Sequence, residues 1–300
     1  MIHYLTHKIF TSFIVACLTL FGFYVILGDY SYISTAKVFL LLIEGLLLDY
    51  FCFKNGILGQ KSHLPLVVFS ILSVLLMPAL SFGDLVYGAV CLSAFFLAFE
   101  AGNNPEKSSM LMMLFGVLLG IAQAISNISV LLMLPFFVLF IRTGIREARS
   151  FVLSIVYFLM VVFSYLGLLF VMELSPQMGS VVPSLSLDYS VFNTILVKLF
   201  VPYVILCIIV HFIGINSYQF RYPNKSKILN YTMLIQAAIA VALILLTAEL
   251  NLMIYVLMSS TILLSFAFGY KKTSVFVNSA FVSLVTIAFM TLYLYKILIL

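Results

Sequence analysis

The chain has 300 residues, of which 64% are hydrophobic and only 8% are charged, and it carries a formal net charge of +5. A soluble domain is about 25% charged, so this composition excludes an ordinary water-soluble globule. The basic residues lie in short segments between apolar runs, which indicates membrane topology and argues against a nucleic-acid partner.

Apolar runs of helix-spanning length follow one another along the chain. Barrel strands would alternate apolar and polar residues, whereas these runs are continuous. We therefore predict an all-α transmembrane bundle, formed by one membrane domain over residues 1–300. The predicted spans are about eleven in number: 9–28, 33–53, 63–82, 85–101, 108–125, 127–142, 150–172, 191–214, 228–248, 251–269 and 274–296. The first run could be a signal ending at a lipoprotein-like Cys17, but it continues to Leu27, which favours a membrane helix.

The loops between these runs alternate in charge. Basic residues gather at the N-terminus and in every second loop, at Lys8, Lys54, Lys61, Lys107, Arg142, Arg146, Arg149, Arg221, Lys225, Lys227, Lys271 and Lys272. The alternate loops carry acidic residues, at Asp29, Asp84, Glu173, Asp188 and Glu249, apart from the neutral segment 126–127. By the positive-inside rule, this pattern predicts a cytoplasmic N-terminus and an outer C-terminus.

Small and sulfur-containing residues in the runs indicate packing. Gly116 and Gly120 form the motif GVLLG, which is typical of close helix contacts. We expect this motif inside the bundle, and a dimer seam is the alternative. The cysteines show no C-x-x-C spacing, so neither a disulfide framework nor a metal site is indicated, and nothing identifies a cofactor. Buried packing is expected of these thiols, at Cys17, Cys52, Cys91 and Cys207.

The segment KVFLLLIEGLLLDY at 37–50 places three ionisable residues in one span. Lys37 can reach outward and Asp49 can reach the inner interface, whereas Glu44 lies too deep for either. Intramembrane carboxyl groups usually face the bundle interior or a wet cavity, and burial favours their protonated form. Lys198, in the eighth span, is the preferred partner of Glu44, although it could also snorkel outward or bind an anionic substrate. Glu44, Lys198 and Lys37 are therefore the candidate substrate-binding residues.

Two acidic residues follow spans one and three and open loops on the same predicted outer face. Asp29 and Asp84 could together serve acid–base chemistry or hold a metal, and topology alone explains their positions equally well. We treat them as the candidate catalytic pair, which requires that they converge at an outward-facing pocket.

A resemblance to known families of membrane proteins rests on two stretches of the chain. They are LLLDYFCFKNGILGQKS at 46–62 and GVLLGIAQAISNISVLLMLPFFVLFIRTGIREARSFVLSIVYFLM at 116–160. They look like an uncharacterised family of short polytopic bacterial inner-membrane proteins. They are also distantly similar to glycosyltransferases that use polyprenyl-linked sugars and to O-antigen polymerases. The resemblance implies a bacterial inner-membrane location and a polyprenyl-phosphate or other anionic lipid partner. Two features depart from it, because the loop at Asp29 is short and every arginine is predicted to be cytoplasmic.

Three functions remain open at this stage. The first is an envelope-glycan assembly enzyme acting on a polyprenyl-phosphate-linked substrate, as the resemblance implies. The second is a transporter or lipid flippase with an intramembrane site at Glu44 and Lys198. The third is a non-catalytic subunit that packs against a membrane partner. An outer pocket containing the two aspartates would favour the enzyme, whereas a central site at Glu44 would favour transport.

Overall fold

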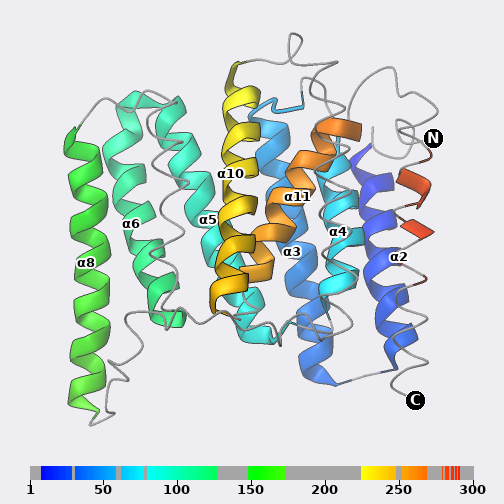
Figure 1. Ribbon diagram of the computed structural model, residues 1–300, viewed down its shortest axis with the longest axis horizontal. Coiled ribbons are helices and arrows are strands. Elements are labelled where there is room, and N and C mark those ends of the chain that lie inside the picture. Colours follow the sequence, from blue (N-terminus) through cyan, green and yellow to red (C-terminus); the bar gives the residue numbers. More distant parts are fainter. Residues whose placement is uncertain are drawn as a thin grey trace.

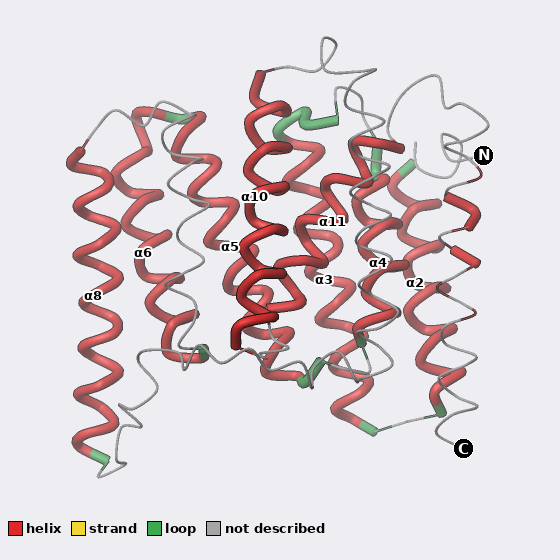
Figure 2. The backbone as a smooth tube through the Cα atoms, viewed as in Figure 1, coloured by secondary structure: helices red, strands yellow, loops and turns green. Residues whose placement is uncertain are grey.

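A computed structural model describes residues 8–28, 31–58, 62–77, 80–126, 148–172, 224–247 and 252–268, together with 279, 281–283, 285–286, 288 and 290. These residues form helices and short connections, with no strand among them. In chain order, the helices are α2 (Ile9–Leu27), α3 (Tyr32–Lys54), α4 (Leu64–Leu76), α5 (Phe82–Asn103), the short 3-10 helix η1 (Pro105–Lys107), α6 (Ser108–Ile125), α8 (Ala148–Val171), α10 (Asn224–Thr247) and α11 (Met253–Phe268). Figure 2 shows that helices dominate the described backbone.

The described helices agree with the apolar runs of the sequence. α2, α3, α6, α8 and α11 each begin and end within two residues of a predicted span. Within the described residues, four segments are long and apolar enough to cross a membrane: Phe82–Asn103, Pro105–Ile125, Arg149–Val171 and Ser226–Ile244. The predicted spans 127–142 and 191–214, and most of 274–296, lie outside the described residues. The total of eleven spans and the sides of the two termini therefore stay predictions.

The boundary between α4 and α5 differs from the prediction. α4 ends at Leu76, six residues before the expected end of its span, and α5 begins at Phe82, three residues early. Pro78 has no backbone N–H to continue a helical ladder. Ser81 and Asp84 form a capping box that fixes the start of α5. Because the connection is apolar, hydrophobicity alone did not indicate the end of α4 or the start of α5.

Side-chain caps and glycines also define other helix ends. Ser31 accepts a hydrogen bond from the backbone N–H of Ser34 at 3.2 Å, which caps α3. Gly28 follows α2 with φ 70°, a left-handed conformation that is costly for residues with a Cβ atom.

The helices stand side by side in an elongated array (Figure 1), with α8 and α6 at one edge and α2 near the other. Several contacts join helix ends on one side of this array: Lys54 Nζ to Glu100 Oε1 at 3.2 Å, Ser109 Oγ to Ser150 Oγ at 3.1 Å, and Ser226 Oγ to the Ile57 carbonyl oxygen at 2.6 Å. These helix ends carry four basic side chains, those of Lys54, Lys107, Arg149 and Lys227. We therefore call this side the basic end. It is the upper side in Figure 1, where α10 begins.

The opposite end is joined by its own contacts. Tyr24 and Thr35 hydroxyls share a hydrogen bond of 2.7 Å between α2 and α3. Lys37 Nζ donates to the Leu80 carbonyl oxygen at 2.6 Å. Consecutive helices from α2 to α6 therefore alternate in direction, in agreement with their short connections.

α11 is the most buried helix of the described part of the chain. Each of its residues from Met253 to Phe268 is buried, and it packs against α4, α5 and α10. Its hydroxyl groups are partly satisfied within the helix, since Thr261 Oγ1 donates to the Leu257 carbonyl at 2.8 Å and Ser265 Oγ to the Thr261 carbonyl at 2.7 Å. A helix with polar residues is thus placed at the centre of an apolar bundle.

The GVLLG motif packs internally, as expected. A Cβ atom at Gly116 would overlap the carbonyl oxygen of Ser154 in α8, and one at Gly120 would lie 2.6 Å from Val161 Cβ. These glycines let the backbones of α6 and α8 approach closely. The motif therefore joins two helices of the same chain.

Candidate intramembrane carboxyl site

Glu44 is fully buried at the middle of α3, with 0% of its surface exposed. It lies twelve residues after Tyr32 and ten before Lys54, which corresponds to about 18 Å and 15 Å of helical rise. Neither of its carboxyl oxygens has a hydrogen-bond partner among the described residues. Burial of a carboxyl group without a partner is costly, so Glu44 requires a physical explanation.

The carboxyl group of Glu44 points toward α5 beside α11. A Cβ atom at Gly88 would lie 3.4 Å from Glu44 Oε1 and would overlap Cδ1 of Ile254. Only a residue without a side chain leaves room for both neighbours at this point of α5. The site is therefore formed where α3, α5 and α11 meet.

Two tyrosines line the same region. Tyr87, next to Gly88, packs edge-on against Tyr255 of α11, with ring centroids 5.9 Å apart. The Tyr255 hydroxyl is buried beside the Cys91 and Tyr87 side chains of α5. Ser259, one turn further along α11, has a buried hydroxyl without a described partner. α11 thus buries hydroxyl groups inside the bundle.

Aromatic packing holds α3 against α5 two turns from Glu44. The Phe51 ring stacks on Phe96 at 4.1 Å with an interplanar angle of 6°, and it meets Phe99 edge-on at 5.2 Å. Aromatic contacts of this kind add to the stability that apolar burial provides. They fix the face of α3 that carries Glu44.

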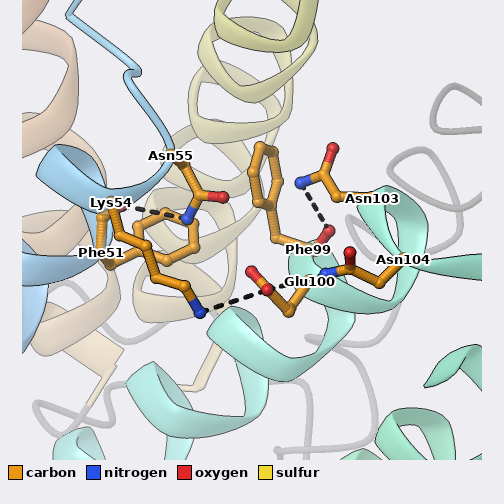
Figure 3. Close-up of polar contacts among 7 residues, drawn as sticks. All are labelled: Phe51, Lys54, Asn55, Phe99, Glu100, Asn103 and Asn104. Carbon is orange, nitrogen blue, oxygen red and sulfur yellow. Dashed lines mark hydrogen bonds and ion pairs between the residues drawn. The ribbon is translucent and has the colours of Figure 1, made fainter.

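Beyond these rings, the same two helices are joined by polar groups at the basic end (Figure 3). Lys54 pairs with Glu100 Oε1 at 3.2 Å, and Asn104 Nδ2 donates to the same oxygen at 2.8 Å. The Lys54 side chain is 51% exposed, so this ion pair contributes little to stability.

Asp49 is buried and paired with a histidine, a contact that the sequence did not predict. It is 2% exposed, and its Oδ2 lies 2.6 Å from Nδ1 of His63. His63 is the residue before α4 and stacks on Phe53, with ring centroids 5.2 Å apart. The hairpin between α3 and α4 brings the two residues together. His63 was not among the predicted site residues, although its place just beyond a short loop was a usable signal.

Lys37 is held by the backbone. Its Nζ donates to the carbonyl oxygen of Leu80, which lies between α4 and α5. This bond satisfies one donor of the ammonium group and ties α3 to the next hairpin. Its role in substrate binding stays a prediction. Lys198, the preferred partner of Glu44, lies outside the described residues.

Asp84 has a structural role at the start of α5. Its Oδ2 accepts a hydrogen bond from the Ser81 backbone N–H at 2.7 Å, and its own N–H donates to Ser81 Oγ at 3.1 Å. Asp29, the other member of the candidate catalytic pair, lies outside the described residues. The convergence of the two carboxylates and their catalytic role therefore stay predictions.

Within the described part of the chain, no group of three or more histidine, cysteine, aspartate or glutamate side chains is placed to hold a metal ion. Comparisons of the chain with protein-family models, curated proteins and solved structures gave no match. The resemblance to glycosyltransferases and O-antigen polymerases stays a prediction.

Proposed function

We propose that the protein is a multi-pass inner-membrane transport protein in which Glu44 takes up and releases a proton during the transport cycle. The observation that carries this proposal is the fully buried Glu44 carboxyl group, which has no hydrogen-bond partner among the described residues and lies at the junction of α3, α5 and α11. The basic end faces the cytoplasm in this proposal, following the positive-inside rule.

An ionised carboxylate at this depth would be unfavourable by about 3 kcal/mol on insertion scales. A protonated carboxyl group avoids most of this penalty, and it can become ionised only when water or a cation reaches it. A change in the access of Glu44 to either side would therefore be coupled to proton binding. This coupling is the elementary step of a proton-driven transporter.

The close packing around Gly88 favours a proton as the bound ion. A proton adds no volume, whereas a bound metal ion needs several oxygen ligands and room for them. Movement of α11 against α5 would change the space beside Glu44, since Ile254 is the neighbour that a Cβ atom at Gly88 would strike. We therefore assign the α5–α11 contact as the moving part of the site.

Transport fits the described residues better than glycan transfer does. The carboxyl group of Asp84 is engaged in the capping box of α5, whereas the carboxyl group of Glu44 is engaged by nothing in the described structure. Buried ionisable groups within membrane spans commonly mark substrate or ion pathways.

Reconstitution in liposomes that enclose a pH-sensitive dye tests the proposal. Sugars, amino acids, organic acids and organic amines are added outside in turn, and we expect one class to drive proton movement through the wild-type protein. Glu44→Gln keeps the shape of the side chain and should abolish this movement. Glu100→Gln is the matched control, because Glu100 is a partly exposed carboxylate at the basic end, and it should behave like the wild type.

Infrared spectroscopy of the same samples reports the proton directly. The absorption band of a protonated carboxyl group should be present in the wild type and should be reduced in Glu44→Gln. Proton movement that is equal in the wild type and Glu44→Gln, or that is absent for all four solute classes, would overturn the proposal.

A further inference from the structure

A second buried acidic group lies on α3 between Glu44 and the basic end. Asp49 and His63 form a short contact of 2.6 Å between Oδ2 and Nδ1. Asp49 Oδ1 has no hydrogen-bond partner in the described structure. An acid and an imidazole in hydrogen-bond contact can exchange a proton.

The side chains of His63, Asp49 and Glu44 become progressively less exposed from the basic end toward the middle of α3. The side chains of His63 and Asp49 are 11% and 3% exposed, and Glu44 is 0% exposed. Asp49 is five residues from Glu44 on the same helix, which is about 7.5 Å of rise. His63 is thus the most exposed of the three, and Asp49 lies between it and Glu44.

We propose that Asp49 and His63 form a proton-exchange site through which Glu44 communicates with the aqueous phase at the basic end. This inference rests on the proposed function, because it names the route for the proton that Glu44 binds. His63 takes a proton from water at Nε2 and gives the proton on Nδ1 to Asp49 Oδ2. The imidazole ends neutral with its proton on the other nitrogen, and Asp49 ends protonated.

The two carboxyl groups leave α3 on different faces. Asp49 contacts His63 at the start of α4, whereas Glu44 points toward Gly88 of α5. Gly45, one turn before Asp49, also faces α4, because a Cβ atom there would lie 3.1 Å from Leu66 Cδ1. A direct hydrogen bond between Asp49 and Glu44 is therefore not formed. Proton transfer between them requires water to enter beside Glu44, which the proposed cycle allows when α11 moves against α5.

Asp49 and His63 are the main acid–base pair in this part of the bundle, as the ionisable groups on the neighbouring helices show. Cys52, one turn along α3, interacts electrostatically with Asp49. α2 and α11 carry no aspartate, glutamate, lysine, arginine or histidine. On α3 and α5, Lys54 and Glu100 pair with each other.

A purely structural role for the Asp49–His63 pair can be distinguished from proton exchange. The contact between Asp49 and His63 also ties α3 to the residue that precedes α4. His63→Asn separates the two roles, since the amide nitrogen of asparagine can donate to Asp49 near the position of Nδ1 but cannot titrate. If the pair is only structural, His63→Asn should resemble the wild type in every assay.

The first test uses nitrogen NMR of the full chain in detergent with labelled histidine. The His63 signal is identified by its loss in His63→Asn. The nitrogen shifts report which ring nitrogens carry a proton, and we expect the proton occupancy of Nδ1 to differ between the wild type and Asp49→Asn, because the Asp49 carboxyl group is the partner of that nitrogen. A His63 signal that is identical in the wild type and Asp49→Asn would overturn the inference, whatever the transport measurements show.

The second test uses the liposome assay and the solute that drives proton movement. His63→Asn and Asp49→Asn should slow this movement by about tenfold or more, with thermal stability close to that of the wild type for His63→Asn. If Glu44→Gln abolishes movement but His63→Asn leaves it unchanged, the inference is wrong and the proposed function stands. If the wild type moves no protons, the proposed function is wrong, and the NMR comparison of the wild type with Asp49→Asn alone decides whether the pair exchanges protons.

Discussion

Gly116 of α6 and Ser154 of α8 are in direct backbone contact, because a Cβ atom at position 116 would overlap the Ser154 carbonyl oxygen. A backbone atom cannot rotate away as a side chain can. The contact therefore tolerates glycine alone, and α8 depends on it for its close approach to α6.

Gly116→Ala should lower the stability of the protein by about 2 kcal/mol, in the range measured for overpacked sites. The matched control is Gly167→Ala in α8, where nothing lies within 4 Å of the added Cβ atom, and it should leave stability unchanged or slightly raised. A thiol-reactive dye that reports exposure of Cys52 and Cys91 on heating measures both. Equal melting temperatures for the two variants would contradict the close contact.

Ser81→Ala should lower the stability of the protein by about 1 kcal/mol, because it removes the side-chain acceptor that caps α5. Asp84→Asn keeps an acceptor oxygen for the Ser81 N–H and should change stability by less than about 0.5 kcal/mol. Thermal unfolding in detergent checks both values.

The same Asp84→Asn variant tests the catalytic assignment. We expect its proton movement in liposomes to equal that of the wild type. A polyprenyl-phosphate sugar-transfer activity that is present in the wild type and lost in stable Asp84→Asn would instead support the glycan-assembly enzyme.

Ser226→Ala should lower stability by about 1–3 kcal/mol, since it leaves the buried carbonyl of Ile57 without its partner. Ser164→Ala is the control, because the exposed Ser164 hydroxyl donates only to the Met160 carbonyl within α8. A loss of stability as large in the control as in Ser226→Ala would show that the bond between α10 and the α3 end contributes nothing specific.

Reporter fusions test the proposed orientation of the bundle. Fusions after Lys107 and Lys227 should report a cytoplasmic location, because both residues lie at the basic end, and fusions after Asp84 and Glu249 should report the outer side. The expression level of each fusion serves as its control. Reversal of two or more of these four results would defeat the orientation.

Much of the helical framework could be predicted because apolar runs and loop charges are local properties. The bounds of α3 and α6 follow from them closely. The end of α4 was misplaced because the cap at Ser81 decides the boundary, and hydrophobicity does not register a cap.

The burial of Glu44 could be expected because its depth in the span depends only on residue counting. The environment of Asp49 could not be obtained in this way. Its burial depends on His63, which approaches it only after the α3–α4 hairpin has closed. The place of Ile254 at the Glu44 site depends on the packing of α11 against α5, and no motif in the sequence predicts that packing.

The bond from Ser226 to Ile57 links residues that are 169 positions apart. At typical rates of translation, α3 is synthesised on the order of ten seconds before Ser226 leaves the ribosome. During this interval, the turn at Ile57 can only be hydrated or bound by another molecule. The turn at Ile57 is therefore completed only when α10 arrives, and nascent chains that stop short of Ser226 should leave it accessible to membrane chaperones and proteases.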